Sequence, residues 1–287
     1  MLNRKEDIIS YIKSICDKEM INNYKLEGIN GNIDIYIPEK KLAIVIKDTY
    51  DDFINGIDKK INQNKVIAGA RIKIRMIHIF EYEWADDTKR EKVKRYLVDT
   101  FNDNKLKIYA RATQVKAVDT EEAKEFINKY HLQGYTSATY NVGLYYKDEL
   151  VSIMTFARPR FNHYYDYEII RLCTKNNVQI LGGTQKMFKR FVDNFNHVSI
   201  LTYADITKFT GNVYTKLGFK VERISDPNYM WVSSDSKTAL PRYRTQKRKL
   251  LRMLPEVDPR MTENDIMEML GFSKVYDCGN LVLSYEK

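Results

Sequence analysis

The sequence predicts a mixed α/β fold (α+β) with two domains in one chain. Short runs of β-branched and other apolar residues alternate with stretches whose apolar residues recur at helical spacing. The chain has 287 residues, of which 44% are hydrophobic, and this is enough to build two hydrophobic cores. Residues 102–105 are entirely polar and form the best candidate linker. We therefore expect one domain before residue 105 and a second one after it.

The first domain, residues 1–105, begins with a predicted helix over residues 3–20, where isoleucines recur at helical spacing between charged residues. Residues 33–37 alternate in hydrophobicity and residues 42–46 are continuously apolar, so together they predict a β-hairpin with its turn at Pro38–Lys41. The remaining predicted elements are a helix over 58–70, a strand over 72–80 and a helix over 88–101.

The second domain, residues 106–232, begins with a strand over 107–110 and a helix that follows a capping sequence at Asp119–Glu122. Residues 140–146 and 150–156 predict a second hairpin. The later predicted elements are a strand over 167–173, a helix over 184–194 opened by Gly182-Gly183, a strand over 199–203 and a short helix over 212–217 that Gly218 stops. We expect residues 233–287, a basic C-terminal extension, to complete this domain with a strand at 281–283.

The strand over 199–203 and the helix that follows it predict a binding crevice. Ligands of α/β sheets bind where the carboxyl end of a strand faces the start of a helix. Tyr203, Asp205 and Tyr214 would all line that crevice.

Composition favours an anionic partner inside the cell. The net charge is +9 and the pI is about 9.1, which suits nucleic acid because each neutralised phosphate releases a condensed counterion. The alternative is a generally lysine-rich composition, since 38 acidic residues are spread along the chain. No membrane-spanning run or signal peptide is evident, so we expect a cytoplasmic protein. The three cysteines have no metal-ligand spacing and are expected to be free thiols.

Several collinear stretches carry a family resemblance. Tyr203–Asp205, Gly211–Tyr214 and Leu217–Phe219 resemble the last part of an N-acetyltransferase-like (GNAT) fold, in the Mom-like version of phage DNA-modification proteins. Residues from about 32 to 287 resemble phage homing endonucleases of the Hef-like or EDxHD type, which join a Vsr-like nuclease domain to this second domain. The stretches that carry this second resemblance are Ile33–Glu39, Ile77–Trp84, Gly143–Tyr146, Met154–Phe156 and Asp277–Val282.

The resemblance implies a nuclease domain of the Vsr/PD-(D/E)xK type whose site is degenerate. Such enzymes cleave DNA with Mg²⁺ held by carboxylates from adjacent strands, as Asp followed by Glu-x-Lys. Asp34 matches the first carboxylate and Lys47 the lysine, but Val45 stands where the glutamate is expected. Asn32 replaces an acidic residue. The expected Asn-Gly and Trp-His are replaced by Lys47-Asp48 and Asp51-Asp52.

We therefore expect the cutting chemistry to be lost, with Asp34 as the one remaining candidate metal ligand. Asp48, Asp51, Asp52 and Glu39 are the acidic residues that might rebuild a site, although loop acids lack the rigid support of a strand. His78 lies within an apolar strand and is expected to be a core histidine rather than a ligand.

The resemblance to Mom-like proteins implies a second reaction centre. It assigns Arg171 to an anionic group, Asp205 to orienting or deprotonating an amine, and Tyr214 to donating a hydrogen bond beside Tyr203. Gly182 and Gly183 partly fit the turn that binds the pyrophosphate of an acyl-CoA-like cofactor. An equally weighted alternative is that both tyrosines are core aromatics, Asp205 caps a turn and Arg171 forms an ion pair.

Basic side chains beside aromatic ones predict a nucleic-acid-binding surface. The alternative is a solvated, charged helix. The candidate residues are Arg158, Arg160, Arg242, Arg244, Lys247 and Arg248.

The expected protein is of phage type, binds DNA or a nucleic-acid-handling partner, and is well placed to inhibit a host defence complex in the host cytoplasm. Two enzymatic alternatives stay open: an active, Mg²⁺-dependent homing endonuclease, and a Mom-like enzyme that transfers a group to DNA bases.

Overall fold

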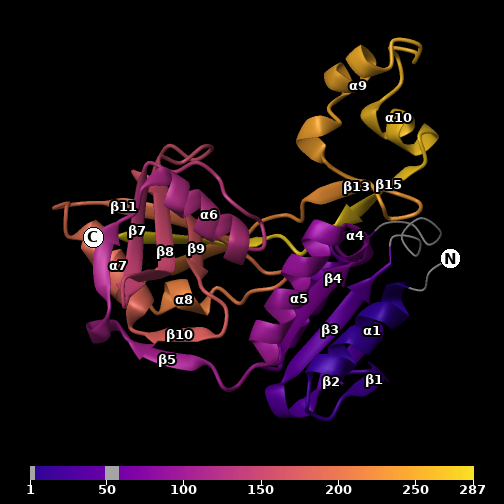
Figure 1. Cartoon of the computed structure of the whole chain (residues 1–287). Helices are drawn as coiled ribbons and strands as arrows, with labels where there is room; N and C mark the ends of the chain where they lie inside the picture. The colour runs from indigo at the N-terminus through magenta and orange to yellow at the C-terminus, as the bar shows by residue number, and fades with distance from the viewer. Residues whose placement is uncertain (1–3, 49–57) are drawn as a thin grey trace. The chain divides into compact units, whose positions relative to one another are not determined.

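The computed structural model describes residues 4–48 and 58–287 and has a mixed α/β fold (Figure 1). The chain forms two compact units, both discontinuous in sequence. Unit 1 comprises Met1–Arg90, Asp205–Thr210 and Ser225–Asn280, and unit 2 comprises Glu91–Ala204, Gly211–Ile224 and Leu281–Lys287. This division corrects the boundaries expected from the sequence. Most of residues 233–287 belong to unit 1, and only the last seven residues, Leu281–Lys287, complete unit 2.

Unit 1 contains a four-stranded sheet in the order β1-β2-β3-β4. The predicted hairpin is confirmed, because β2 (Ile33–Ile37) pairs antiparallel with β3 (Leu42–Lys47). β1 (Ile21–Tyr24) extends the sheet at β2. β3 also pairs in parallel with β4 (Arg75–Phe80), and α3 (Ile61–Arg71) lies between them in the sequence. The carboxyl ends of β3 and β4 therefore meet at one edge of the sheet.

In the described part of the chain before residue 102, unit 1 also contains α1 (Arg4–Ile15), α4 (Glu81–Ala85) and the start of α5 (Asp87–Phe101). The predicted first helix is confirmed as α1, which buries Ile8 and Ile12 completely. It also contacts α4, the helix that directly follows β4. The Trp84 indole nitrogen donates to the Asp7 carboxylate at 2.6 Å, so α1 is fastened to the end of β4.

The segment Ser225–Asn280 adds a small α+β module to unit 1. Its strands β13 (Tyr229–Ser233), β14 (Ala239–Pro241) and β15 (Phe272–Tyr276) pair in the antiparallel order β14-β13-β15. Two short helices, α9 (Lys247–Met253) and α10 (Glu263–Met269), pack with β13 and β15, as the orange and yellow ribbons of Figure 1 show. Trp231 is 1% exposed beneath them.

Buried polar contacts fasten this module to the rest of unit 1. Asn62 and Gln63 of α3 donate their side-chain amides to the carbonyl oxygens of Tyr276 and Cys278 at 2.8 and 3.0 Å. A second returning segment, Asp205–Thr210, is fastened in the same way: the ammonium of Lys208 bonds to both Glu83 carboxylate oxygens, at 2.9 and 3.0 Å, and to the His78 carbonyl oxygen at 3.0 Å. These polar side chains are buried because segments distant in the sequence supply their partners.

Unit 2 is built on a seven-stranded mixed sheet in the order β12-β16-β11-β9-β8-β7-β6. Its strands β9 and β11 run parallel, whereas the pairs β6–β7, β7–β8 and β8–β9 are antiparallel. The strands are β6 (Gln114–Ala117), β7 (Tyr140–Tyr146), β8 (Glu149–Ala157), β9 (Tyr167–Thr174), β11 (Ser199–Asp205), β12 (Lys220–Ile224) and β16 (Asn280–Glu286). A separate parallel pair joins β5 (Leu106–Tyr109) to β10 (Val178–Leu181).

The helices of unit 2 bury two hydrophobic clusters against this sheet. α7 (Gly183–Val192) packs on β7 and β8, where the rings of Phe156 and Phe191 stack with centroids 3.6 Å apart. α6 (Thr120–Tyr130) packs on β8 and β9. The predicted cap of α6 is confirmed, since the Asp119 carboxylate accepts from the backbone N–H of Glu121 and Glu122. α8 (Asn212–Thr215) is shorter than expected.

Candidate functional sites

The residues that the sequence suggests for a nuclease centre lie in unit 1, on strands β2, β3 and β4. The register pairs Val45 with His78, and its continuation across the hairpin places Asp34 opposite Val45. Paired residues on adjacent strands share one face of a sheet. The candidate metal ligand Asp34 therefore lies on the same face of the sheet as Val45 and His78, directly across the strands from them.

Both oxygens of the Asp34 carboxylate are engaged within the protein. Oδ2 accepts the backbone N–H of Ile46 at 2.6 Å, and Oδ1 lies 2.5 Å from the ammonium nitrogen of Lys5 on α1. The Asp34 side chain is only 14% exposed. A lysine of the same chain thus supplies the positive charge that a metal ion would supply beside this carboxylate.

His78 is a buried core histidine, as the sequence predicts. Its side chain is fully buried, and neither ring nitrogen has a hydrogen-bond partner in the described structure. Burial lowers the pKa of His78 to about 3, with smaller contributions from the nearby charges of Lys65, Lys208 and Lys47. The imidazole is therefore neutral near pH 7.

Two carboxylates meet at the edge where β3 and β4 end. The side chains of Asp48 and Glu81 share a hydrogen bond, and burial together with the charge of Asp48 raises the pKa of Glu81 to about 7. Arg4 and Lys5 act in the opposite direction. Glu81 escaped the sequence-based prediction. The signal that could have found it is that Glu81 directly follows β4, while Asp48 directly follows β3, the parallel neighbour of β4.

These residues do not fit a Mg²⁺-dependent nuclease site. Mg²⁺ needs several oxygen ligands, but Asp34 is occupied by Lys5 and Val45 offers no ligand atom. Glu39 instead pairs with Lys18 at 3.0 Å. Within residues 4–48 and 58–287, no three His, Cys, Asp or Glu side chains converge as metal ligands. Asp51 and Asp52 lie outside the described residues.

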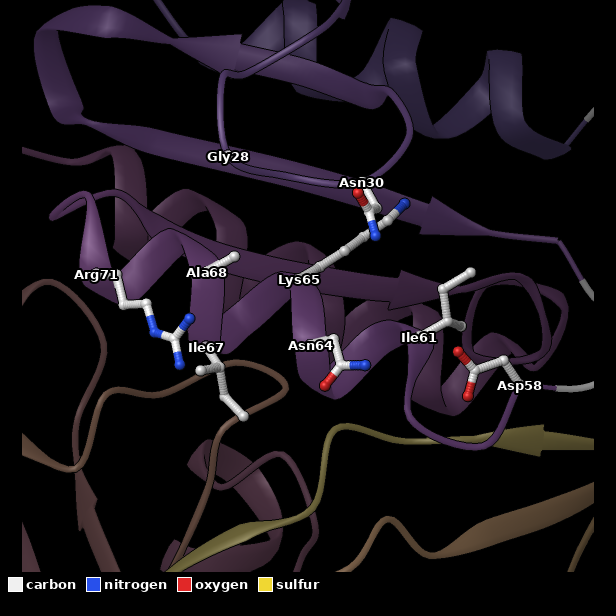
Figure 2. A pocket seen from close by; sticks show the side chains of 9 residues that line it. All are labelled: Gly28, Asn30, Asp58, Ile61, Asn64, Lys65, Ile67, Ala68 and Arg71. Atoms are coloured by element: carbon white, nitrogen blue, oxygen red, sulfur yellow. The ribbon is translucent and has the colours of Figure 1, made fainter.

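An open pocket adjoins this centre on the outer side of α3 (Figure 2). Figure 2 shows Lys65 extending from α3 towards Asn30, with Arg71 at the far end of the helix. The Lys65 ammonium donates to the Asn32 carbonyl oxygen at 3.4 Å. Burial lowers the pKa of Lys65, and the nearby charge of Asp34 opposes that effect. The pocket is thus lined by two cations and one carboxylate, that of Asp58.

In unit 2, the Arg171 guanidinium forms hydrogen bonds with nearby backbone and hydroxyl oxygens. Its guanidinium donates to the carbonyl oxygens of Gly134 and Ile170, both at 2.9 Å, and to the hydroxyl of Thr136 at 3.3 Å. Burial is the main cause that lowers its pKa, followed by the charge of Arg160. These contacts give Arg171 a structural role in holding the segment after α6.

The structure brings two of the four residues of the proposed reaction centre together, because the charges of Arg171 and Tyr214 act on one another. Tyr214 is buried, packs on Phe219 and has its hydroxyl hydrogen-bonded to Thr202. The Asp205 carboxylate accepts the Thr207 backbone N–H at 2.9 Å and so caps a turn of unit 1. Burial and the charge of Glu168 raise the pKa of Tyr203. These placements match the core-aromatic and turn-capping alternatives for Tyr214 and Asp205.

The glycine turn before α7 is explained by packing. Gly182 has φ 77°, a conformation that glycine adopts without strain. A Cβ at Gly183 would lie 2.5 Å from Cγ2 of Ile180 and 2.9 Å from Cδ1 of Leu144, so only glycine fits there. The turn therefore requires no acyl-CoA-like cofactor to account for its residues.

The predicted basic residues of the C-terminal segment form an exposed surface of unit 1. We call Arg242, Arg244, Lys247 and Arg248 the basic cluster; all but the half-buried Lys247 are exposed. Tyr243, 59% exposed, carries the Arg244 guanidinium 5.9 Å and the Lys249 ammonium 5.6 Å from its ring centroid. An exposed aromatic ring surrounded by cations is typical of surfaces that bind phosphates and bases.

The remaining predicted basic residues lie in residues 158–166, which we call the β8–β9 loop. Phe161 and Tyr164 of this loop are 88% and 96% exposed. The charge of Arg158 acts on Asp166 and Tyr167, whereas that of Arg160 acts on Glu168 and Arg171. Tyr164 escaped the sequence-based prediction, although it lies four residues after Arg160 in the sequence.

Comparisons with known proteins add no assignment. No protein-family model matches the sequence, and a search of curated proteins returned no match. Among the described residues, no helix combines the length and apolar character needed to cross a membrane.

Proposed function

We propose that this chain is a nucleic-acid-binding protein whose nuclease-derived centre does not cut. The basic cluster is the observation that carries the proposal. Arg244 of this cluster and the adjacent Lys249 lie over the ring of the exposed Tyr243, in a chain of net charge +9. Nucleic-acid backbones bind such surfaces because neutralising phosphates releases counterions, and exposed bases stack on the aromatic ring.

The absence of cutting follows from the Asp34–Lys5 pair. A metal ion polarises the phosphate and lowers the pKa of the attacking water, which an ammonium group cannot do. The Lys5 ammonium places a positive charge beside Asp34, but unlike a metal ion it has no coordination position that a water or a phosphate oxygen could occupy. A bound phosphate would meet cations here without being attacked.

Binding without cleavage suits a protein that blocks other nucleic-acid enzymes. A chain of this kind can compete for DNA, or occupy a nucleic-acid-handling partner. We infer inhibition of a host defence complex as one use of this activity. The reason is that a nuclease needs open metal ligands at positions where this chain has Asn32, Val45 and the Asp34–Lys5 pair.

The test is the affinity for labelled duplex DNA across a salt series. The triple variant Arg244→Ala/Lys247→Ala/Arg248→Ala should bind more weakly, and its slope of log affinity against log salt should fall by about 3 if three phosphate contacts are lost. The matched control removes three exposed lysines elsewhere, as Lys216→Ala/Lys220→Ala/Lys237→Ala. An equal loss of slope in both variants would remove the basic cluster from the interface.

The two enzymatic alternatives have distinct signatures. Metal-dependent cleavage that disappears in Asp34→Ala would restore the endonuclease. Cofactor binding together with a mass change on DNA bases would restore group transfer by unit 2.

A further inference from the structure

The β8–β9 loop presents the two most exposed large apolar side chains in the described ranges. Phe161 is 88% and Tyr164 is 96% exposed. Large aromatic side chains are normally at least partly buried, because their rings dominate the apolar area that folding removes from water. Two neighbouring rings left this exposed point to a surface that another molecule covers.

The base of this loop is fixed although its tip is exposed. The Asp166 carboxylate accepts both the backbone N–H and the hydroxyl of Ser199 at 2.8 Å, and the Asp166 N–H donates to the Ser199 carbonyl oxygen at 3.0 Å. The loop begins and ends in β8 and β9, two strands inside the sheet of unit 2. A tip on such a base loses less conformational entropy on binding than a free segment would lose.

The two arginines of the loop favour an anionic partner with planar groups. Arg158 and Arg160 precede the rings in the sequence, and their charges act on different neighbours, Tyr167 and Glu168 respectively. Arginine contacts phosphates, and aromatic rings stack on bases. Phenylalanine and tyrosine also occur at membrane interfaces, so binding to lipid vesicles is the competing outcome of the test.

We propose that the β8–β9 loop binds unpaired nucleobases, by stacking them on Phe161 and Tyr164 while Arg158 and Arg160 contact the flanking phosphates. The proposal rests on the proposed function and refines it by naming single-stranded or unpaired nucleic acid as the ligand of unit 2. Bases within a duplex have both faces covered by their neighbours, so two aromatic rings gain most from unpaired bases.

The experiment measures the binding of a short DNA single strand that contains 2-aminopurine, beside a duplex of the same length. Stacking on either ring should quench 2-aminopurine. Phe161→Ala and Tyr164→Ala should each weaken single-strand binding roughly tenfold and restore the fluorescence. Their salt slopes should stay unchanged, because stacking releases no counterions. Phe161→Tyr and Tyr164→Phe keep a ring and should retain affinity and quenching. The matched control is Tyr109→Ala, which removes another exposed aromatic ring of unit 2.

Failures of the two proposals are distinguishable. If the wild-type protein binds DNA but the ring variants bind the single strand like wild type, or lose duplex binding equally, the loop proposal is overturned and the proposed function stands. If the wild-type protein binds neither strand form, both fall. Ring-dependent binding to phosphatidylglycerol vesicles, without ring-dependent binding to the single strand, would assign the loop to a membrane and also overturn the proposal.

Discussion

At the scale of single residues, Asp34 shows how contacts within the protein can occupy both oxygens of a strand carboxylate. The sequence correctly placed Asp34 on a strand beside Val45. It could not show that Lys5, 29 positions earlier in the sequence, reaches this carboxylate, because an ion pair between distant segments leaves no periodic pattern. The same reason explains why Glu81 was missed, since only the parallel pairing of β3 and β4 brings it to Asp48.

The first prediction concerns the structural role of Asp34. Asp34→Ala leaves the Ile46 N–H without its acceptor and Lys5 without its partner, so the free energy of unfolding should fall by about 1–3 kcal/mol. Urea denaturation measures this change. The control Asp17→Ala removes a carboxylate from the protein surface and should have little effect. If Asp34→Ala is as stable as wild type, the two contacts are dispensable.

The second prediction concerns pH and Glu81. The pKa of Glu81 is about 7 in the folded protein, above its ordinary value of 4.5, so the folded state holds a proton that the unfolded state has released. The contribution of this group to stability is therefore present below pH 4.5 and is lost as the pH rises to about 7. Glu81→Gln keeps the hydrogen bond without the titration.

Urea midpoints at pH 5 and pH 8 test this prediction. From pH 5 to pH 8, the wild-type protein should lose on the order of 1–3 kcal/mol more stability than Glu81→Gln loses. The exposed control Glu125→Gln should follow wild type. Identical pH dependence in wild type and Glu81→Gln would contradict the shared proton.

At the scale of elements, most strands of both units follow from the sequence, because a strand of alternating or continuous hydrophobicity is a local pattern. Both predicted hairpins are confirmed, and so are α1 and the cap of α6. The module of β13, β14 and β15 with α9 and α10 was not predicted beyond its charge. Its helices are seven residues each and its strands are short, so local periodicity gives little signal.

The third prediction concerns Glu263, at the start of α10. One carboxylate oxygen of Glu263 accepts from the Trp231 indole at 3.0 Å, the Tyr229 hydroxyl at 3.2 Å and the Thr245 hydroxyl at 3.3 Å. Glu263→Ala removes the acceptor of the Trp231 indole and the Tyr229 hydroxyl, whereas Thr245 keeps the Arg242 carbonyl oxygen, and it should destabilise the module by about 1–3 kcal/mol. Hydrogen exchange should rise in residues 229–276 while residues 33–47 keep their protection.

Glu268→Ala is the matched control, because Glu268 is an exposed glutamate of the same helix. The account of α10 fails if both variants exchange alike. It also fails if Glu263→Ala raises exchange throughout unit 1, since the effect would then not be confined to the module.

At the scale of the whole molecule, the discontinuous units are the largest difference from the sequence-based expectation. The chain enters unit 1 again at Asp205–Thr210 and at Ser225–Asn280. Lys208 shows why the return of the chain to unit 1 cannot be predicted from local sequence. In the sequence it is a charged residue in a polar loop, but in the fold it is only 4% exposed because Glu83, distant in the sequence, forms an ion pair with it. Linker composition therefore predicted a boundary at residues 102–105, which lie inside unit 2, whereas the chain passes between the units within α5, after Arg90.

The most direct test of binding without cleavage is one experiment on the full chain. Labelled duplex and single-stranded DNA are incubated with saturating protein and with Mg²⁺ or Mn²⁺. Complexes are counted on a native gel, and the strands are then resolved on a denaturing gel. We predict that the DNA is bound and every strand stays intact. Metal-dependent cleavage that Asp34→Ala abolishes would contradict the proposal, and so would the absence of any complex at moderate salt.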